Sequence, residues 1–590
     1  MRYQTMCHAF QRTAAACPDA VAIRSLGGAV SITWREYAAR VRSIAAGLAG
    51  LGVRPGDTVG IMLTNRPEFH LVDTAILHAG ATPFSIYNTN PADTIEYLFE
   101  NAGNRVVVCE EQFVARLQEV QARGSKVEHI VCVDAAPAGT ISLADVEAAP
   151  LEGFDFDAIW QAVRPEDLLT IVYTSGTTGM PKGVELTHAN LIFNVDAVAA
   201  AGAAPQSGER VLSYLPDAHL ANRYVCQYVS LMNGTEITTV ANPREVLAGL
   251  LEVRPAVFMG VPQTWYKIKA GIEAALAAEQ NPRRRQLAQW AIGAGTRKVR
   301  AEQAGRRVGM RLRVEHAVAE RIVLSKVRAK LGLDQTRIPA SGAAPISSET
   351  HEFMMAIGLP IRECWGMSEL SAAATVHRAD AIQVGTVGTA VPGVEIKLAD
   401  DGELLVRGDL VMRGYRKDPA KTAETIDPDG WLHTGDIGTI DTDGTVRIID
   451  RKKDLIINSS GKNMSPANIE NTIRDACPMV GIAVAIADQR PFVTALLVLD
   501  PDTAAGYAAR HGLADESPAA LAAYPALRQE IQAGIDAANT KLSQVEKVRA
   551  FTIVSEYWLP GSDVLTPTMK VRRKPVIERY AAEIDAMYTR

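Results

Sequence analysis

The chain has 590 residues, of which 47% are hydrophobic and 22% are charged, so we expect a water-soluble protein built from several subdomains. Its formal net charge of −6 predicts no nucleic-acid partner, and no apolar run has the length of a membrane span. The seven cysteines are scattered and never spaced Cys-x-x-Cys, which argues against a disulfide framework and predicts a reducing, cytoplasmic location. The first ten residues lack an uninterrupted apolar stretch, so no signal peptide is expected.

Helical and strand patterns alternate over the first 110 residues, and a similar pattern returns at 211–265. Such alternation predicts parallel βα units with helices on both faces of a sheet. The first expected elements are a helix at 34–51, a strand at 58–63, a helix at 68–79 and a strand at 105–109.

A loop rich in glycine and threonine, residues 173–185, follows an apolar run at 167–173 that predicts a buried strand. Thr187 then suits the N-cap of a helix. Small residues let the backbone approach a ligand, consecutive N–H groups can converge on an anion, and lysine adds positive charge, so this loop suits phosphate. For the glycines and threonines alone, a surface turn is the simpler interpretation. The candidate phosphate-binding residues are Thr174, Ser175, Gly176, Thr177, Thr178, Gly179 and Lys182.

Residues 281–330 are helical in pattern and rich in arginine. Three interpretations stay open for this region: a solvated helical face, a patch for the phosphates of a ligand, and a patch for an anionic membrane surface.

Three short stretches further along carry residues suited to a nucleotide. The small residues of 341–345 would let a flat ring lie against the backbone, although this could be an ordinary loop. The stretch 363–369 ends in Glu369, and carboxylates hold Mg²⁺ in nucleotide sites. In 430–438, Asp436 at a tight turn could accept hydrogen bonds from two ribose hydroxyls or cap its own backbone.

From residue 402 the expected strands shorten. Residues 402–407 and 445–450 alternate like antiparallel strands, with a hairpin turn at Asp443-Gly444. We place a domain boundary at the basic segment that follows, which gives domains 1–450 and 451–590. The second domain is expected to be small and α+β, with a helical segment at 501–546. Its basic stretch 565–575, which contains Lys570, would by composition alone be a solvated tail.

Five of these stretches, in this order, resemble the motifs of the adenylate-forming (AMP-binding) superfamily, which includes acyl-CoA synthetases, peptide-synthetase adenylation domains and luciferases. Two further segments, 212–223 and 257–262, look most like long-chain fatty acyl-CoA synthetases, and Met-Ser-Glu at 367–369 is typical of their bubblegum-like branch. The five stretches are 173–185, 341–345, 363–369, 430–438 and 565–575.

The resemblance implies an α/β fold with a large N-terminal domain of several subdomains and βα-layered sheets. A small α+β C-terminal domain would rotate about a hinge at Lys453. The resemblance also implies three catalytic residues: Lys570 bridging substrate carboxylate and α-phosphate, Glu369 as the metal ligand, and His219 near the acyl and thiol channel. A buried structural role is the alternative for His219.

The resemblance further implies an ATP site outside the glycine-rich loop. The sequence departs from the family at Trp365, where tyrosine is usual, and at Ser368, where threonine is usual. Serine keeps a hydroxyl for the α-phosphate, and tryptophan can stack on adenine but cannot accept a hydrogen bond. The residues concerned are Ser341, Gly342, Ala343, Trp365, Gly366, Met367, Ser368, Asp436 and Arg451.

The expected activity is that of an ATP-dependent ligase that converts a long-chain fatty acid into acyl-AMP and then acyl-CoA, using ATP, Mg²⁺ and coenzyme A. Alternatives are a fatty acyl-AMP ligase delivering to a carrier protein, an acid–CoA ligase for a non-fatty acid, and an ATP-binding protein without turnover. Asp217 lies in a Leu-Pro-Asp context that does not match an amine-binding aspartate, so an amino-acid substrate is disfavoured. Monomer and homodimer both stay open, as does peripheral contact with the inner face of the membrane.

Overall fold

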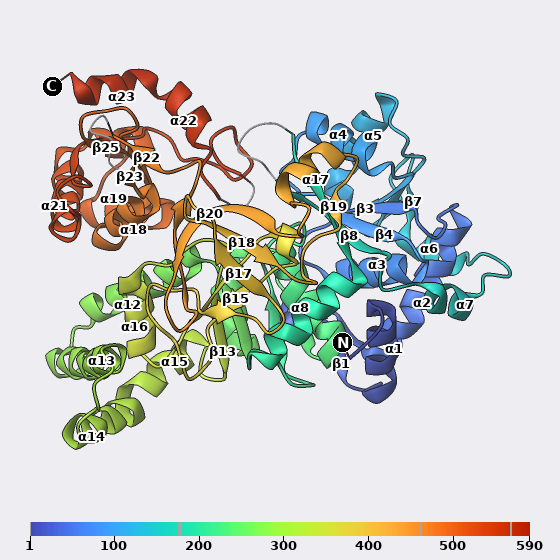
Figure 1. Ribbon diagram of the computed structural model, residues 1–590, viewed down its shortest axis with the longest axis horizontal. Coiled ribbons are helices and arrows are strands. Elements are labelled where there is room, and N and C mark those ends of the chain that lie inside the picture. The colour runs from blue at the N-terminus through green and yellow to red at the C-terminus, as the bar shows by residue number, and fades with distance from the viewer. Residues whose placement is uncertain (1, 175–179, 459–462, 567–568, 590) are drawn as a thin grey trace.

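The computed structural model describes residues 2–174, 180–458, 463–566 and 569–589. A large N-terminal body occupies most of the molecule, and a smaller C-terminal body lies at the upper left of Figure 1. Within the described residues the strands form five sheets. None of the helices in these ranges is long and apolar enough to cross a bilayer.

An eight-stranded sheet forms the first layer of the N-terminal body, in the order β19-β9-β8-β4-β3-β5-β6-β7. Strands β3 to β8 pair in parallel where they meet, as predicted, whereas β9 and β19 are antiparallel additions at one edge. The bounds are β3 Thr58–Met62, β4 Thr82–Ser85, β5 Val106–Cys109, β6 His129–Cys132, β7 Ile141–Ser142, β8 Leu168–Thr174, β9 Lys182–Thr187 and β19 Gly414–Tyr415.

Both faces of this sheet are covered by helices, which explains why β3, β4 and β5 are buried along their whole length. Along β5, Val106 and Val108 join a core shared with α2 and α3, whereas Val107 and Cys109 join a core shared with α4 and α5. The covering helices are α2 Trp34–Gly50, α3 Pro67–His78, α4 Ala92–Ala102 and α5 Glu111–Ala122, of which α2 and α3 confirm the predicted helices.

A nine-stranded sheet forms the second layer, in the order β16-β15-β14-β13-β12-β10-β11-β1-β2. Its parallel strands β12, β13 and β14 run in register, with Gly260 opposite Ser341 and Ser341 opposite Glu363, so their carboxyl ends lie side by side. The bounds are β1 Val21–Ser25, β2 Ser31–Thr33, β10 Arg210–Ser213, β11 Glu236–Thr239, β12 Val257–Gly260, β13 Ile338–Ser341, β14 Arg362–Trp365, β15 Thr375–Val376 and β16 Thr389–Ala390.

A helical insertion separates β12 from β13 and confirms the helical prediction for 281–330. Its helix α13 packs on α16, where a Cβ added to Gly295 would lie 2.0 Å from the Ala356 carbonyl oxygen, so only glycine fits there. Figure 1 shows α13 and α14 projecting at the lower left. The elements are α12 Pro262–Ala278, α13 Pro282–Gln303, α14 Met310–Ala319, the π-helix η4 Glu320–Leu324, α15 Ser325–Leu331 and, after β13, α16 Ser348–Ala356.

A four-stranded antiparallel sheet, β17-β18-β20-β21, completes the N-terminal body. The predicted hairpin at Asp443-Gly444 joins β20 to β21, with the Thr445 amide donating to Asp443 Oδ1 over 3.0 Å. The bounds are β17 Glu395–Leu398, β18 Glu403–Arg407, β20 Leu432–Ile440 and β21 Val446–Arg451. Apart from short 3₁₀ helices, the remaining described helices of this body are α1 Met6–Ala16, α6 Leu143–Ala148, α7 Phe156–Ala162, α8 His188–Ala200, α9 Leu220–Asn222, the π-helix η2 Arg223–Tyr228, α10 Val229–Asn233, α11 Val246–Val253 and α17 Pro419–Thr425.

The C-terminal body is α+β, as predicted. A three-stranded sheet, β24-β25-β26, carries one apolar core on each face, because alternate residues of the fully buried β25 contribute to different cores. Its elements are β22 Ile456–Ile457, β23 Asn463–Met464, α18 Pro466–Ala476, β24 Val480–Ile486, β25 Val493–Leu499, α19 Pro501–His511, α20 Pro518–Ala523, α21 Pro525–Lys541, β26 Val548–Ile553, α22 Arg573–Arg579 and α23 Ala581–Tyr588.

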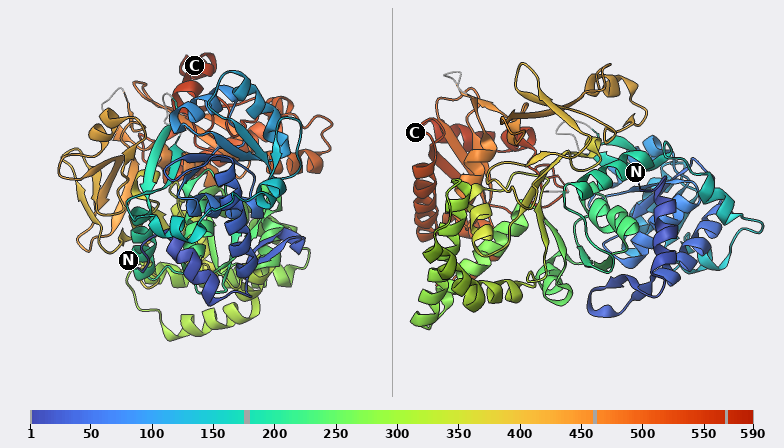
Figure 2. Two further views of the ribbon diagram at one scale, coloured as in Figure 1. Left: turned by 90° about the vertical axis from the view of Figure 1, so that its right-hand side faces the viewer. Right: turned by 60° about the horizontal axis from the view of Figure 1, so that its bottom comes forward.

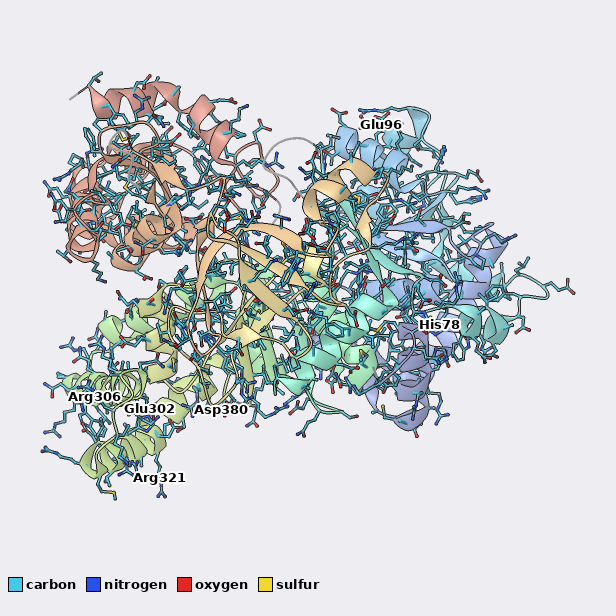
Figure 3. All side chains as sticks on the ribbon, in the orientation of Figure 1. His78, Glu96, Glu302, Arg306, Arg321 and Asp380 are labelled. Atoms are coloured by element: carbon cyan, nitrogen blue, oxygen red, sulfur yellow. The ribbon has the colours of Figure 1, made fainter. Side chains whose placement is uncertain are left out.

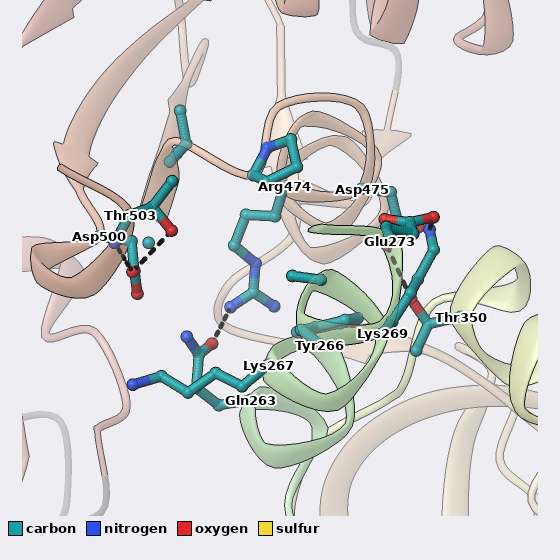
Figure 4. A pocket seen from close by; sticks show the side chains of 14 residues that line it. Gln263, Tyr266, Lys267, Lys269, Glu273, Thr350, Arg474, Asp475, Asp500 and Thr503 are labelled. Carbon is teal, nitrogen blue, oxygen red and sulfur yellow. Dashed lines mark hydrogen bonds and ion pairs between the residues drawn. The ribbon is translucent and has the colours of Figure 1, made fainter. Parts of the chain in front are cut away.

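Polar contacts join the two bodies across α12 and α16 on one side and α18, α19 and α21 on the other. The right-hand view of Figure 2 and the close-up in Figure 4 show this junction. Thr350 Oγ1 donates to Asp475 Oδ1 over 3.1 Å, and Lys267 Nζ lies 2.7 Å from Asp502 Oδ2. Glu349 pairs with Lys269 from its own body and with Lys541 from the other. These contacts hold the C-terminal body in one orientation.

Candidate active site

The carboxyl ends of β13 and β14 form the floor of the site. A Cβ added to Gly342 would lie 2.8 Å from Cys364 Sγ and 2.8 Å from Met259 Cε, and one added to Gly366 would lie 1.9 Å from the Ala372 carbonyl oxygen. Backbone atoms therefore require glycine at position 366, whereas a side chain at position 342 would have to displace the ends of Cys364 and Met259. Ala343 has φ +69°, a left-handed conformation that turns the chain after β13.

Asp436 links two of the predicted nucleotide-binding stretches. Its Oδ2 accepts a hydrogen bond from Trp365 Nε1 over 2.7 Å, and its Oδ1 lies 3.1 Å from Arg451 Nε. The pairing of β20 with β21 places Asp436 directly opposite Arg451. Three predicted residues thus meet at one carboxylate, which is 6% exposed.

The predicted tight turn at Asp436 is wrong, because this residue lies within β20. The strand is irregular at this point: Gly435 has φ +70°, and the β20–β21 register shifts between Ile437 and Gly438. The Asp436 amide donates to Thr434 Oγ1 over 3.1 Å, so a threonine caps this backbone and the aspartate side chain faces other partners.

Glu369 lies in the short 3₁₀ helix η5 Ser368–Leu370, which follows β14 through Gly366 and Met367. Its Oε1 accepts a hydrogen bond from the Tyr415 hydroxyl over 2.8 Å. Burial and the charge of Glu369 raise the pKa of Tyr415, so the tyrosine keeps its proton as the donor.

Lys182 belongs to the same cluster, with its Nζ 5.1 Å from the centre of the Tyr415 ring. The loop predicted for 173–185 ends earlier than expected, because Lys182 begins β9, which pairs antiparallel with β8 and sets Lys182 opposite Thr174. Five predicted phosphate-binding residues lie outside the described residues: Ser175, Gly176, Thr177, Thr178 and Gly179. Thr187 is the N-cap of α8, as predicted.

Sequence reasoning did not identify Tyr415. Tyr415 follows a glycine in a segment too short to show hydrophobic periodicity. Only the pairing of β19 with β9 places Tyr415 opposite Val184, near Lys182. The contact between Tyr415 and Glu369 therefore depends on tertiary structure.

Lys570 comes from the C-terminal body and reaches this cluster. Its amide donates to Thr566 Oγ1 over 3.0 Å. Its side chain is exposed, yet protein atoms on several sides reduce the water around its ammonium group. This desolvation, together with the positive charge of Arg451, lowers the pKa of Lys570 to about 8, while Asp436 and Glu369 oppose the shift. Residues of both bodies thus share one electrostatic environment.

His219 is half-buried and caps α9, because its Nδ1 accepts a hydrogen bond from the Ala221 amide over 3.2 Å. Burial, and then the charge of Lys570, lower the pKa of His219 to about 4, so its ring is neutral near pH 7. His219 therefore makes a structural hydrogen bond at the start of α9 and also lies close enough to Lys570 for its charge to affect the His219 pKa.

Asp217 is a buried carboxylate two residues before His219. Its Oδ1 accepts from Asn222 Nδ2 over 2.6 Å, and its Oδ2 has no hydrogen-bond partner among the residues that the structure describes. Burial raises the pKa of Asp217 to about 7. Nothing in its sequence context indicated this environment.

The last predicted position, Lys453, follows β21 and is exposed. Desolvation and the neighbouring Arg451 lower the pKa of Lys453. Within the described ranges no group of three or more His, Cys, Asp or Glu side chains could enclose a metal ion. A single carboxylate suits Mg²⁺ bound largely by substrate phosphates and water, which fits Glu369 as the protein ligand.

Comparison with known families agrees with this geometry. Residues 10–416 match the family described as AMP-binding enzyme, and residues 453–590 match the AMP-binding enzyme C-terminal domain. The chain belongs to the AMP-binding enzyme family. The family predicted from the sequence motifs is therefore confirmed.

Curated relatives within this family carry related names. A putative fatty-acid–CoA ligase, fadD11, from Mycobacterium tuberculosis is 52% identical over 76% of this chain and 79% of its own length. The long-chain-fatty-acid–CoA ligase FadD15 from Mycobacterium bovis is 34% identical over 97% of this chain and 95% of its own length. The long-chain-fatty-acid–CoA ligase ACSBG2 from Xenopus laevis is 31% identical over 98% of this chain and 83% of its own length.

Solved structures confirm the predicted fold class. ATP-bound MatB from Rhodopseudomonas palustris is 25% identical, with a TM-score of 0.69 over 97% of this chain and 99% of that chain. The anthranilate CoA ligase AuaEII is 19% identical, with a TM-score of 0.74 over 99% of this chain and 98% of that chain, and supports the fold alone.

Proposed function

We propose that the protein is an ATP-dependent fatty-acid–CoA ligase that forms acyl-AMP and then acyl-CoA. The observation that carries this proposal is that Lys570 of the C-terminal body lies in the electrostatic environment of Asp436 and Glu369 of the N-terminal body. The names of the curated relatives support a long-chain fatty acid as the substrate.

In the proposed adenylation step, a carboxylate oxygen of the acid attacks the α-phosphorus of ATP and pyrophosphate leaves. Two anions must approach each other, so positive charge at the reacting centre is the main requirement. We propose that Lys570 supplies that charge and that Thr174, Lys182 and the loop between them hold the outer phosphates. Ser368 would donate to the α-phosphate.

The nucleoside would be held at the carboxyl ends of the parallel strands. We propose that Asp436 accepts from the ribose hydroxyls, since each carboxylate oxygen can accept a second hydrogen bond beside those from Trp365 and Arg451. The Trp365 ring and the backbone of Ser341, Gly342 and Ala343 would enclose adenine. Glu369 would hold Mg²⁺, which offsets phosphate charge when bound.

In the proposed second step, the thiol of coenzyme A attacks the acyl carbon and AMP leaves. We propose a domain boundary between residues 450 and 451, with Lys453 as the hinge and His219 beside the thiol channel. Rotation at the hinge would withdraw Lys570 and break the polar contacts between α12, α16 and the C-terminal body. Such a motion concentrates the backbone change in few residues.

Substituting Trp365 by phenylalanine tests the ribose site. Phenylalanine keeps an aromatic face for adenine but removes the hydrogen bond to Asp436, and bonds to charged groups contribute about 1.5–3 kcal/mol, so we expect the KM for ATP to rise roughly tenfold. Steady-state pyrophosphate release measures this change. Trp431→Phe is the matched control, because the Trp431 ring contacts Lys397 and Arg407 rather than Asp436. This variant should leave the KM for ATP unchanged. A wild-type KM in Trp365→Phe would show that the hydrogen bond does not support ATP binding.

Pyrophosphate release across unbranched acids from two to eighteen carbons tests the proposed substrate, with AMP release followed with and without coenzyme A. We expect activity to rise with chain length and sustained AMP release to require coenzyme A. Turnover that is independent of coenzyme A would instead favour an acyl-AMP ligase serving a carrier protein. A preference for aromatic or short acids would favour a non-fatty acid–CoA ligase.

We further propose that the protein works in the cytoplasm with peripheral membrane contact. Light scattering of the purified protein would separate monomer from homodimer.

A further inference from the structure

The helical insertion differs sharply in charge from the rest of the molecule. Residues 282–331 contain fourteen Lys and Arg residues and three Glu residues, a net charge of +11. The rest of the chain contains forty-seven basic and sixty-four acidic residues, a net charge of −17. Positive charge is thus concentrated on one projecting element of an acidic protein, which favours an anionic partner at that element.

An apolar stripe runs along α14 and η4, made of four residues spaced four apart. Met310 is 74% exposed, Val314 57%, Val318 42% and Ile322 41%. This spacing keeps the residues on neighbouring turns of a helix. We call these four residues the apolar stripe.

The opposite side of this helix is the one packed against the protein. Ala319 and Leu324 are buried with Ala291 and Ala294 of α13 in a small core of their own. Arg297 of α13 pairs with Glu315 of α14 and ties the two helices together. The structure therefore holds α13 and α14 together while the apolar stripe faces outward.

Unpaired arginines lie in, and just before, the helical segment that carries the apolar stripe. Other arginines of the insertion are engaged, such as Arg300 with Glu352 and Arg328 with Glu320. Figure 3 places the labelled Arg306 and Arg321 on the projecting insertion. Within the described part of the chain, these exposed arginines have no ion pair or side-chain hydrogen bond: Arg306, Arg307, Arg311, Arg313 and Arg321.

We propose that the apolar stripe and its arginines dock the protein on an anionic lipid bilayer. Burying apolar side chains at the boundary between lipid headgroups and acyl chains is favourable, because it removes them from water. Guanidinium groups can pair with lipid phosphates at the same depth, and helices that lie in the membrane interface combine these two features. A site for the phosphates of coenzyme A would need these arginines within reach of the pantetheine arm from the acyl group, but α13 and α14 project at the edge of the molecule (Figure 1). Nucleic acid would use the arginines but leave the apolar stripe in water.

This docking deepens the proposed function, because a long-chain fatty acid partitions into bilayers and would be collected there. The docking itself does not depend on catalysis and can be measured without ATP, acid or coenzyme A. If the substrate proved not to be a long-chain fatty acid, the vesicle-binding experiment would still test this surface independently.

Flotation of the full-length protein with vesicles tests the proposal. Wild-type protein should float with phosphatidylcholine vesicles containing phosphatidylglycerol, should bind pure phosphatidylcholine vesicles weakly, and should be released by high salt. Reversing four arginines (R306E, R307E, R311E and R313E) should lower partitioning at least roughly tenfold, since each basic residue near the surface adds attraction. The triple variant M310D, V314D and V318D should lose partitioning by a similar factor, because the inserted residues become charged.

Matched variants separate docking from general surface effects. Changing the same four arginines to lysine keeps the charge and should preserve partitioning, as should L559D together with L247D, which alter exposed leucines elsewhere. Thermal unfolding and pyrophosphate release with a water-soluble short-chain acid confirm that each variant is folded. Equal partitioning of wild-type and both docking variants overturns the proposal. A dimer without vesicles that becomes monomeric in the triple variant also overturns it, because a second copy would then cover the apolar stripe.

Discussion

Replacing Lys570 by alanine is expected to slow acyl-adenylate formation by roughly 10²–10³-fold, the usual effect of removing one preorganised charge-stabilising donor. Lys570 is the C-terminal residue that shares an electrostatic environment with Asp436, Arg451 and Glu369. ATP affinity should change little, because the proposed nucleoside contacts lie in the N-terminal body. Single-turnover formation of acyl-AMP, together with calorimetric titration of ATP, measures the two effects separately.

Lys574→Ala is the matched control, because Lys574 lies on the same basic segment and its side chain is 72% exposed beside Glu578. It should retain wild-type adenylation. Adenylation that survives in Lys570→Ala would show that the proposed role of Lys570 is wrong.

The pH dependence provides a second measure of Lys570. Because the pKa of Lys570 is lowered to about 8, its ammonium form is complete well below pH 8 and is lost as the pH rises through that value. The kcat/KM for ATP reports ionisations of the free enzyme, so we expect it to fall above pH 8. This alkaline limb should be absent from the residual activity of Lys570→Ala. The same limb in both proteins would assign the ionisation to another group.

The second large effect is expected for Glu369→Gln. Glutamine keeps the size of the side chain and an oxygen that can accept from Tyr415, but it removes the charge proposed to hold Mg²⁺. Adenylation should fall by roughly 10²–10³-fold at millimolar Mg²⁺, in line with the loss of a transition-state charge interaction. The Mg²⁺ concentration that gives half-maximal ATP binding should also rise, which calorimetry can measure.

Tyr415→Phe separates the charge of Glu369 from its positioning. This variant removes the hydroxyl that donates to Glu369 but keeps the ring beneath Lys182. We expect a loss of roughly tenfold, since one hydrogen bond to a carboxylate contributes about 1.5–3 kcal/mol. If Glu369→Gln shows no change in Mg²⁺ dependence while Tyr415→Phe is strongly impaired, Glu369 acts as a structural partner of Tyr415.

Much of the site could be predicted because its motifs are short and carry their chemistry in residue type. Asp436, Arg451 and Trp365 were each predicted for the nucleotide, and the structure brings all three together. Their mutual contacts could not be predicted, because Trp365 ends a strand of one sheet and Asp436 belongs to another. The substitution of tryptophan for the usual tyrosine has a physical reading in the structure, since the indole N–H donates to Asp436.

Two errors of the sequence interpretation have a common cause. Lys182 was expected in a loop and Asp436 in a tight turn, but both lie in strands. Glycines flank each position, and a glycine pattern indicates a turn unless strand pairing overrides it. The pairing partners, β8 and β21, are set by tertiary structure.

By itself, the sequence determined the family, the alternation of strands and helices in the first 110 residues and the residue types that we propose for phosphate, ribose and carboxylate. These follow from local periodicity and from short motifs. Only the tertiary structure decided that Lys570 shares an electrostatic environment with Asp436 and Glu369, because their proximity depends on how two domains dock. It also decided that the apolar residues of α14 face water. In the sequence, apolar residues spaced four apart look the same whether that face of the helix packs on a core or is exposed.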